Sequence, residues 1–138
     1  MKTLVVLAVS IVMVSIFSCP MVMAAPSMPS DLQIVQPDPS LPKELSAFFG
    51  KWQSIPYPEG FFVIVEKIDE GKASLYVWAP MAETSGSSWM RREAKVVKEG
   101  RKYKLWYPGR WGNAEFTLKG EHLIFSGPQD SGRLRRVE

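Results

Sequence analysis

The residues of this sequence that could do chemistry are few, and most of them are aromatic. The 138 residues include one histidine, His122, and one cysteine, Cys19. Zinc sites of the Cys/His kind and Cys–His nucleophilic pairs need more of these residues. There is no Gly-rich phosphate loop and no Gly-x-Ser-x-Gly elbow. A carboxylate pair such as Glu59 with Asp130 would support glycosidase chemistry only if the two faced each other at about 5 to 10 Å. We therefore expect a protein that is not an enzyme and holds no metal or cofactor.

Six aromatic residues lie in or beside the longer connections between predicted strands. Aromatic rings offer flat apolar faces and a hydrogen-bonding edge, which suit an apolar, amphipathic or sugar ligand. The alternative is that they only fill the mouth of a small barrel, as side chains do in many eight-stranded barrels. The predicted ligand-binding residues are Tyr57, Phe61, Trp78, Trp89, Tyr107 and Trp111.

Basic residues are predicted near the same connections. The four arginines concerned are Arg91, Arg92, Arg110 and Arg133. A guanidinium fork suits an anionic head group or a phosphate. Pairing with Glu93 and Glu115 on solvated strand faces explains these arginines as well, and it is the interpretation we favour.

The elements that must position these side chains are mostly strands. A short helix is predicted between Ser40 and Gly50, with Leu41, Leu45, Phe48 and Phe49 on its apolar face. From Lys51 onward, β-branched and aromatic runs recur every 8 to 12 residues or so, with turn residues between them. After the run that begins at Lys51, the segments are 61–68, 72–79, 89–98, 101–107, 113–119, 122–126 and 133–137. This pattern predicts an all-β antiparallel up-and-down barrel of about eight short strands, preceded by a short N-terminal helix.

The lengths of the connections divide the barrel into two ends. Three short connections, 69–71, 99–100 and 120–121, fall at one end if neighbouring strands pair in order. The longer ones, 56–60, 80–88, 108–112 and 127–132, fall at the other. We expect a closed end with tight turns and an open end where a ligand could enter. The pattern leaves open whether the sheet closes or flattens into a sandwich.

This arrangement resembles the lipocalin and calycin barrels. Those families begin with a short helix that leads into a Gly-x-Trp on the first strand, here Gly50-Lys51-Trp52. Their last strand supplies a basic residue that packs over the tryptophan, and Arg135 or Arg136 is placed to do so here. The resemblance thus implies structural roles for Gly50, Trp52 and one of these arginines. It concerns architecture, and a fold does not by itself determine a function.

The run from Phe48 to Val137 is also similar to small exported bacterial domains of uncharacterised role. These domains share a Phe-x-Gly-x-Trp start, which is Phe48 to Trp52 here. They also share a Tyr-x-Trp strand, here Tyr76-Val77-Trp78, and a Trp-x-Arg strand, here Trp89-Met90-Arg91.

The N-terminal residues predict export. Lys2, an apolar run from Leu4 to Phe17 and Val22-Met23-Ala24 follow the grammar of a secretory signal peptide, with cleavage after Ala24. The alternative is lipidation at Cys19, which would anchor the protein to a membrane. The predicted organisation is a signal peptide over 1–24, an extended Pro-rich arm over 25–40 and a single barrel domain over 41–138.

The function predicted from these features is that of an exported protein, periplasmic or secreted, which binds a small hydrophobic or amphipathic ligand among the aromatics of the open end. A cell-envelope interaction module that binds a protein or glycan through its loops is the alternative. The formal net charge of +3 is too small to favour nucleic acid as a partner. A membrane is expected as a partner only if Cys19 is lipidated.

Overall fold

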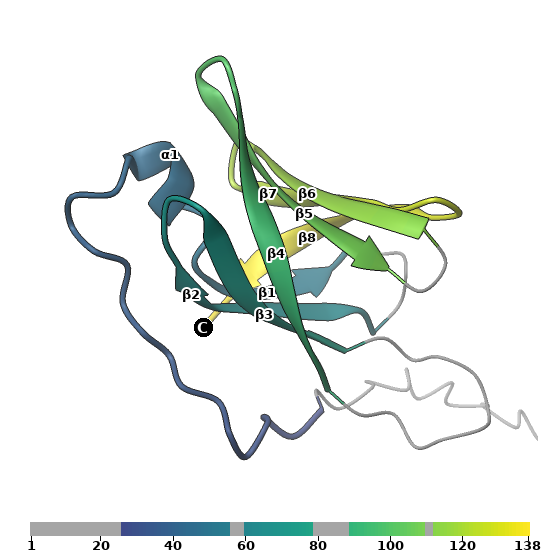
Figure 1. Ribbon diagram of the computed structural model, residues 1–138. Coiled ribbons are helices and arrows are strands. Elements are labelled where there is room, and N and C mark those ends of the chain that lie inside the picture. Colours follow the sequence, from purple (N-terminus) through teal and green to yellow (C-terminus); the bar gives the residue numbers. More distant parts are fainter. Residues whose placement is uncertain (1–25, 56–59, 79–88, 110–111) are drawn as a thin grey trace, which may run out of the picture.

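The computed structural model describes residues 26–55, 60–78, 89–109 and 112–138. In this part of the chain, eight antiparallel strands form a closed barrel in which each strand pairs with its sequence neighbour and β1 pairs with β8 (Figure 1). The predicted all-β class and up-and-down topology are confirmed, and the sheet closes. The strands are β1 (Gly50–Ser54), β2 (Phe62–Ile68), β3 (Lys72–Trp78), β4 (Met90–Glu99), β5 (Lys102–Gly109), β6 (Gly112–Lys119), β7 (His122–Ser126) and β8 (Ser131–Val137).

The helix before the barrel, α1 (Lys43–Ser46), is shorter than the sequence pattern predicts. Its N-cap is Pro42, whereas Ser40 donates its backbone N–H to the carboxylate of Asp38 at 2.8 Å. After α1 the backbone tightens, because the N–H of Phe48 donates to the carbonyl of Leu45 at 3.1 Å, an i to i+3 bond. This turn buries Phe48 beside Leu45, so the apolar face is kept although the helix ends early.

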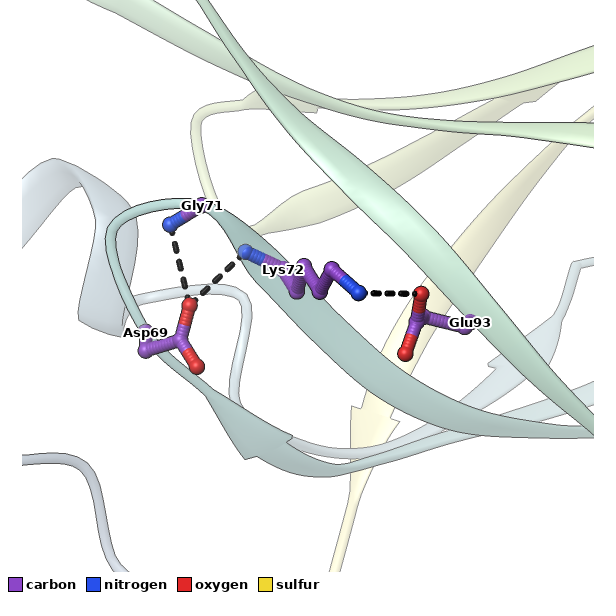
Figure 2. A network of polar contacts seen from close by, with 4 residues as sticks. All are labelled: Asp69, Gly71, Lys72 and Glu93. Carbon is purple, nitrogen blue, oxygen red and sulfur yellow. Dashed lines mark hydrogen bonds and ion pairs between the residues drawn. The ribbon is translucent and has the colours of Figure 1, made fainter.

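Tight turns close one end of the barrel, where β2–β3, β4–β5 and β6–β7 are joined. In the first of them the carboxylate of Asp69 accepts hydrogen bonds from the N–H groups of Gly71 at 2.9 Å and Lys72 at 2.8 Å (Figure 2). These two bonds lower the pKa of Asp69. The Lys72 ammonium forms an exposed ion pair with Glu93 of β4 at 2.8 Å, which also links β3 to its neighbour (Figure 2).

Two connections at the other end are shorter than predicted. β5 continues to Gly109 and β6 begins at Gly112, so the predicted loop 108–112 is largely strand. A Cβ on Gly109 would lie 2.6 Å from the carbonyl oxygen of Gly112, and this close approach explains why the hairpin needs glycine there. β8 likewise begins at Ser131, because the N–H of Gly127 donates to the carbonyl of Asp130 at 2.7 Å and closes the turn early.

The interior of the barrel is filled by alternate residues of all eight strands and by the residues around α1. The largest apolar side chains that are fully buried include Trp52, Phe48, Phe116, Leu75, Leu105, Leu123 and Leu134. Leu75, Leu105 and Leu123 come from β3, β5 and β7, and each has no exposed surface. The middle of the barrel is therefore a packed core.

The longest strand, β4, divides its pairing between two neighbours. Met90 to Lys95 pair with β3, and Lys95 to Glu99 pair with β5. Toward the open end, Met90–Ala94 and Tyr107–Gly109 are therefore not paired with each other, and the ladder between β4 and β5 stops (Figure 1).

The arm of residues 26–40 is not a free tether. Its backbone contacts β2 and Trp89, the residue before β4. The N–H of Val35 donates to the carbonyl of Glu66 at 2.8 Å, and the indole N–H of Trp89 donates to the carbonyl of Ser27 at 2.6 Å. From there the arm continues to α1 (Figure 1). No helix in the described residues is long and apolar enough to span a bilayer.

Candidate functional site

The closed end is a structural plug. The guanidinium carbon of Arg136 lies 4.2 Å from the ring centroid of Trp52, so Arg136 is the arginine of the pair that covers the indole. Arg135 is exposed and has the opposite orientation to its neighbour Leu134, which is buried in the core. The indole N–H of Trp52 donates to the carbonyl of Phe48 at 2.9 Å.

Arg136 also ties the plug to the chain before β1. Its guanidinium donates to the carbonyl oxygens of Ala47, at 2.7 Å, and Phe49. Burial lowers the pKa of Arg136. Gly50 has φ +119°, and a Cβ there would lie 2.5 Å from a guanidinium nitrogen of Arg136. The Gly-x-Trp start therefore provides room for the arginine that covers the tryptophan.

The open end contains a chain of four aromatic rings inside the barrel. Phe61 and Phe125 have centroids 5.0 Å apart, Phe125 and Phe116 are 5.5 Å apart, and Phe116 stacks on Tyr107 at 5.9 Å. Of the predicted ligand-binding residues, Phe61 and Tyr107 thus belong to one cluster, although other rings lie between them. We call these four residues, Phe61, Tyr107, Phe116 and Phe125, the mouth cluster.

Arg92 lies beside the mouth cluster, at the point where the β4–β5 ladder stops. It has the same orientation on β4 as Ala94, which is buried in the barrel core. Burial raises the pKa of Tyr107, and the positive charge of Arg92 acts in the opposite direction. The two side chains are therefore electrostatic neighbours across the unpaired stretch.

Among the residues that the structure describes, the hydrogen-bond partners of Arg92 are neutral. Its guanidinium donates to the carbonyl of Arg91 and to the sulfur of Met90, both at 3.2 Å. In the described ranges, no carboxylate lies within ion-pair distance of Arg92. The mouth thus combines an apolar aromatic floor with an exposed guanidinium at its rim, an arrangement that can bind an amphipathic anion.

Trp78 and Trp89 do not lie in the mouth, contrary to the expectation from the sequence. Leu75 and Val77 belong to the barrel core, so the alternation of β3 turns Tyr76 and Trp78 to the outside. On that outer face the ring of Phe62 meets Trp78 at 5.9 Å and Trp89 at 6.4 Å. These tryptophans therefore form a second, external cluster.

Other residues named from the sequence are placed as follows. Tyr57 and Trp111, like Arg110 and Glu59, fall outside the described residues. The favoured pairing of the arginines with Glu93 and Glu115 is wrong for Arg91, which pairs with Glu66 at 2.5 Å. Glu93 pairs with Lys72, and Glu115 with Lys104 at 3.1 Å. Within the described residues, no three His, Cys, Asp or Glu side chains gather as metal ligands would.

Sequence reasoning missed Phe116 and Phe125 as members of the mouth cluster. The signal was present, because Ala114 and Phe116 alternate with polar residues on β6, as Leu123 and Phe125 alternate on β7. It also missed Glu66, the charged residue that is buried in the described part of the chain, with 1% of its surface exposed. No local pattern marks that residue, since its burial depends on the distant arm.

Comparison with models of protein families, with curated proteins and with solved structures found no match. The closed eight-stranded antiparallel barrel is consistent with a calycin-like architecture.

Proposed function

We propose that this protein binds a small amphipathic ligand at the open end of the barrel. The apolar part of the ligand lies on the mouth cluster, and an anionic head group pairs with Arg92. The observation that carries the proposal is the position of Arg92, a guanidinium beside four clustered rings that has no acidic partner among the described residues.

The physical terms favour such a ligand. Phe61, Tyr107 and Phe116 are already buried, so the apolar gain comes mainly from the ligand's own surface and from the half-buried Phe125. This gain is about 25 cal/mol for each Å² of apolar area removed from water. A carboxylate or phosphate can accept two parallel hydrogen bonds from one guanidinium, which orients the head group. The peptide groups of Tyr107–Gly109 that face away from β6 lack a strand partner in β4, and they offer further polar contacts at the rim.

The depth of the site limits the size of the ligand. Below the mouth cluster, the interior is occupied by Leu75, Leu105 and Leu123, which have no exposed surface. A long chain cannot enter a packed core without displacing these side chains. We therefore propose a ligand that lies across the mouth of the barrel, or one of which only a short apolar end enters the mouth.

We further propose that the protein is exported and that the mature chain, after removal of the signal peptide, begins at Ala25. The support is the N-terminal grammar of a charged residue, an apolar run and small residues before the cleavage point. Lipidation of Cys19 remains the competing proposal, and the intact mass of the protein from its own cells distinguishes the two.

Native mass spectrometry on the protein purified from the cells that produce it tests both proposals. We expect a chain that begins at Ala25 and carries an added mass that denaturation removes. An Arg92→Gln variant should lose most of this added mass, whereas the matched variant Arg133→Gln, changed on the outer face of β8, should keep it. An added mass that is unchanged in Arg92→Gln, or a wild-type protein without any, would contradict binding at the mouth.

A further inference from the structure

The outer face of β2 and β3 is buried although it points away from the barrel core. Phe62, Ile64, Tyr76 and Trp78 are between 1% and 9% exposed, and none of them belongs to the interior core. Together with Trp89, they form an apolar surface on the outside of the barrel, which we call the outer cluster. Tyr76 and Trp89 meet edge to face at 6.5 Å, so the rings of β2 and β3 form one continuous patch with Trp89, the residue before β4.

The arm lies on this outer cluster in the manner of a bound peptide. The indole N–H of Trp89 donates to the carbonyl of Ser27, which follows a proline. Pro26, Pro29 and Leu32 are half-buried, whereas the residues between them are exposed. Leu32 follows a turn, in which its N–H donates to the carbonyl of Pro29 at 3.3 Å, so only Pro26 and Pro29 have the spacing of three that places side chains on one side of a polyproline II segment. Pro26-Ser27-Met28-Pro29 is a Pro-x-x-Pro segment tied to the outer cluster by the bond from Trp89, and docking of such segments on aromatic grooves is a recurring mode of peptide recognition.

A second anchor lies further along the arm, at Glu66. The buried carboxylate of Glu66 accepts a hydrogen bond from the backbone N–H of Gln33 at 3.2 Å. The backbone carbonyl of Glu66 accepts a second one from the backbone N–H of Val35 at 2.8 Å. Arg91 fixes the carboxylate from the other side at 2.5 Å and stacks over Tyr76 at 5.6 Å. Glu66 has the same outward orientation on β2 as Ile64, and the register shift between Val65 and Lys67 then returns Ile68 to the interior.

An acidic residue of the arm lies between the two anchors. Interaction with the carboxylate of Asp31, together with burial, raises the pKa of Tyr76. The Tyr76 hydroxyl is buried and lacks a hydrogen bond of standard geometry in the described structure. The surface thus offers an aromatic groove for prolines, a donor for a carbonyl, a hydroxyl for an acidic group and an acceptor for a backbone N–H.

The arm is bound to the barrel without being part of it. All eight strands pair and close without the arm, and the interior core contains no residue of 26–40. Half of the surface of Met28, Ile34 and Val35 remains exposed, so the arm is not packed as a core element is. Between Gln36 and Ser40 the chain is exposed except for the half-buried Pro37, so this connection adds little to the contacts that hold the arm.

We propose that the outer cluster is a binding groove for extended, proline-containing peptides, and that the arm occupies it in cis. The partner is a segment of another protein with Pro-x-x-Pro spacing, which displaces the arm. This groove lies on the outside of β2–β4, so it is a second site, separate from the mouth.

The test uses the chain from Ala25 with a protease-cleavage sequence inserted after Gln36. Cutting the folded protein leaves the arm held only by its contacts. The probe is a synthetic peptide of residues 25–36 with a fluorophore at its C-terminus, and binding is followed by fluorescence anisotropy. We expect the cut protein to bind the peptide, and the uncut protein to bind it about tenfold more weakly or worse, because the tethered arm competes at a high effective concentration.

Two matched changes test the recognition chemistry. A Trp89→Phe variant of the cut protein keeps an aromatic ring and removes the indole N–H, so the peptide should bind about fivefold more weakly. A peptide with Pro26→Ala and Pro29→Ala should lose most of its affinity, whereas Met28→Ala, at an exposed position, should bind as the natural peptide does.

Several results would overturn the proposal. One is a cut protein with an unchanged circular dichroism spectrum that does not bind the peptide, and another is equal binding of the natural and proline-free peptides. Unfolding of the barrel on cutting would show that the arm is a fixed part of the fold. A dimer of the uncut protein in analytical ultracentrifugation that Trp89→Phe abolishes would assign the groove to the arm of a second copy.

Discussion

The two ends of the barrel differ in how completely their polar groups are satisfied. At the closed end, the indole N–H of Trp52 and the guanidinium of Arg136 both donate to carbonyls of the residues before β1. At the open end, Arg92 is an exposed cation without an acidic partner in the described chain, and the β4–β5 ladder stops beside it. Both ends contain aromatic rings. At the closed end, Trp52 and Arg136 donate hydrogen bonds to backbone carbonyls, whereas at the open end Arg92 has no acidic partner among the described residues.

This difference separates stability from binding. A large ring that is buried and fully hydrogen-bonded fixes a fold, because few alternative arrangements satisfy it. A rim whose guanidinium has no acidic partner among the described residues is available to a ligand that supplies an anionic group. We therefore expect substitutions at the closed end to change the free energy of unfolding, and substitutions at the open end to change affinity.

The largest effect is expected for Trp52→Ala. Removing this fully buried ring leaves a cavity beneath Arg136 and should lower the free energy of unfolding by about 3 to 5 kcal/mol. Urea unfolding followed by circular dichroism measures the change. The matched variant Trp106→Ala removes a half-buried ring on the outer face of β5 and should lose about 1 kcal/mol or less. Equal losses in the two variants would contradict the role of the closed end as the structural plug.

A smaller loss is expected for Gly50→Ala. The new Cβ meets the guanidinium of Arg136, and the backbone at φ +119° disfavours any side chain, so the loss should be about 2 kcal/mol. Gly100→Ala is the control, since Gly100 also has positive φ but a Cβ there would meet nothing within 4 Å. The difference in thermal midpoint between the two variants measures the contact with Arg136 together with the greater backbone cost at φ +119°, since Gly100 has φ +62°. A loss at Gly100 as large as that at Gly50 would show that backbone conformation alone matters.

At the open end, Arg92→Gln should change affinity and leave the fold intact. We expect the free energy of unfolding to stay within about 0.5 kcal/mol, because the side chain is exposed and has no ion-pair partner in the described residues. The affinity for decanoate, measured by isothermal titration calorimetry, should fall about tenfold through loss of the charge-assisted hydrogen bonds. Unchanged affinity would remove Arg92 from the site.

The smallest effects concern pH, and the two ends should respond on opposite sides of neutrality. The pKa of Asp69 is lowered in the folded protein. Its contribution to the free energy of unfolding is therefore present above the unfolded-state pKa, near 3.8, and is lost as pH falls through the lower folded-state pKa. The pKa of Tyr107 is raised in the folded protein. Its contribution to the free energy of unfolding is therefore present below the unfolded-state pKa, about 10, and is lost as pH rises through the higher folded-state pKa.

Variants separate these two contributions. Asp69→Asn should flatten the acid side of the curve of unfolding free energy against pH, and Tyr107→Phe should flatten part of the alkaline side, where Tyr76 contributes in the same direction. Urea titrations at a series of pH values measure both sides. A variant that flattens the wrong side would show that the pKa shift was assigned to the wrong cause.

The fold was predictable because its signals are local. Turn residues recur at regular intervals from Asp69 to Gly127, and each pair of strands is short enough to be joined by them. The helix was overestimated because its apolar period continues through Phe48 and Phe49, whereas the backbone tightens there to bury Phe48 inside the barrel. Packing of Phe48 into the barrel core therefore determined where the helix ends, although the apolar helical period of the sequence continues further.

The candidate site was only partly predictable, and the reason lies in β2 and β3. Phe62-Val63-Ile64-Val65 and Leu75-Tyr76-Val77-Trp78 are apolar on both faces, so alternation alone does not tell which side is inside. On β6 the outer residues Glu115, Thr117 and Lys119 are polar, and the inner face is unambiguous there. The two-sided apolar strands are typical of a sheet covered on both faces, and here the second cover is the arm.

The most direct test of ligand binding at the mouth is a titration of the ¹⁵N-labelled protein with decanoate, followed by NMR of backbone and arginine side-chain signals. We expect chemical shifts to change at Arg92, Tyr107, Phe116 and Phe125, with decyltrimethylammonium, which has the same chain and the opposite charge, producing much smaller changes there. Shifts that are confined to the outer cluster around Trp78 and Trp89, or equal effects of the two amphiphiles, would contradict the account.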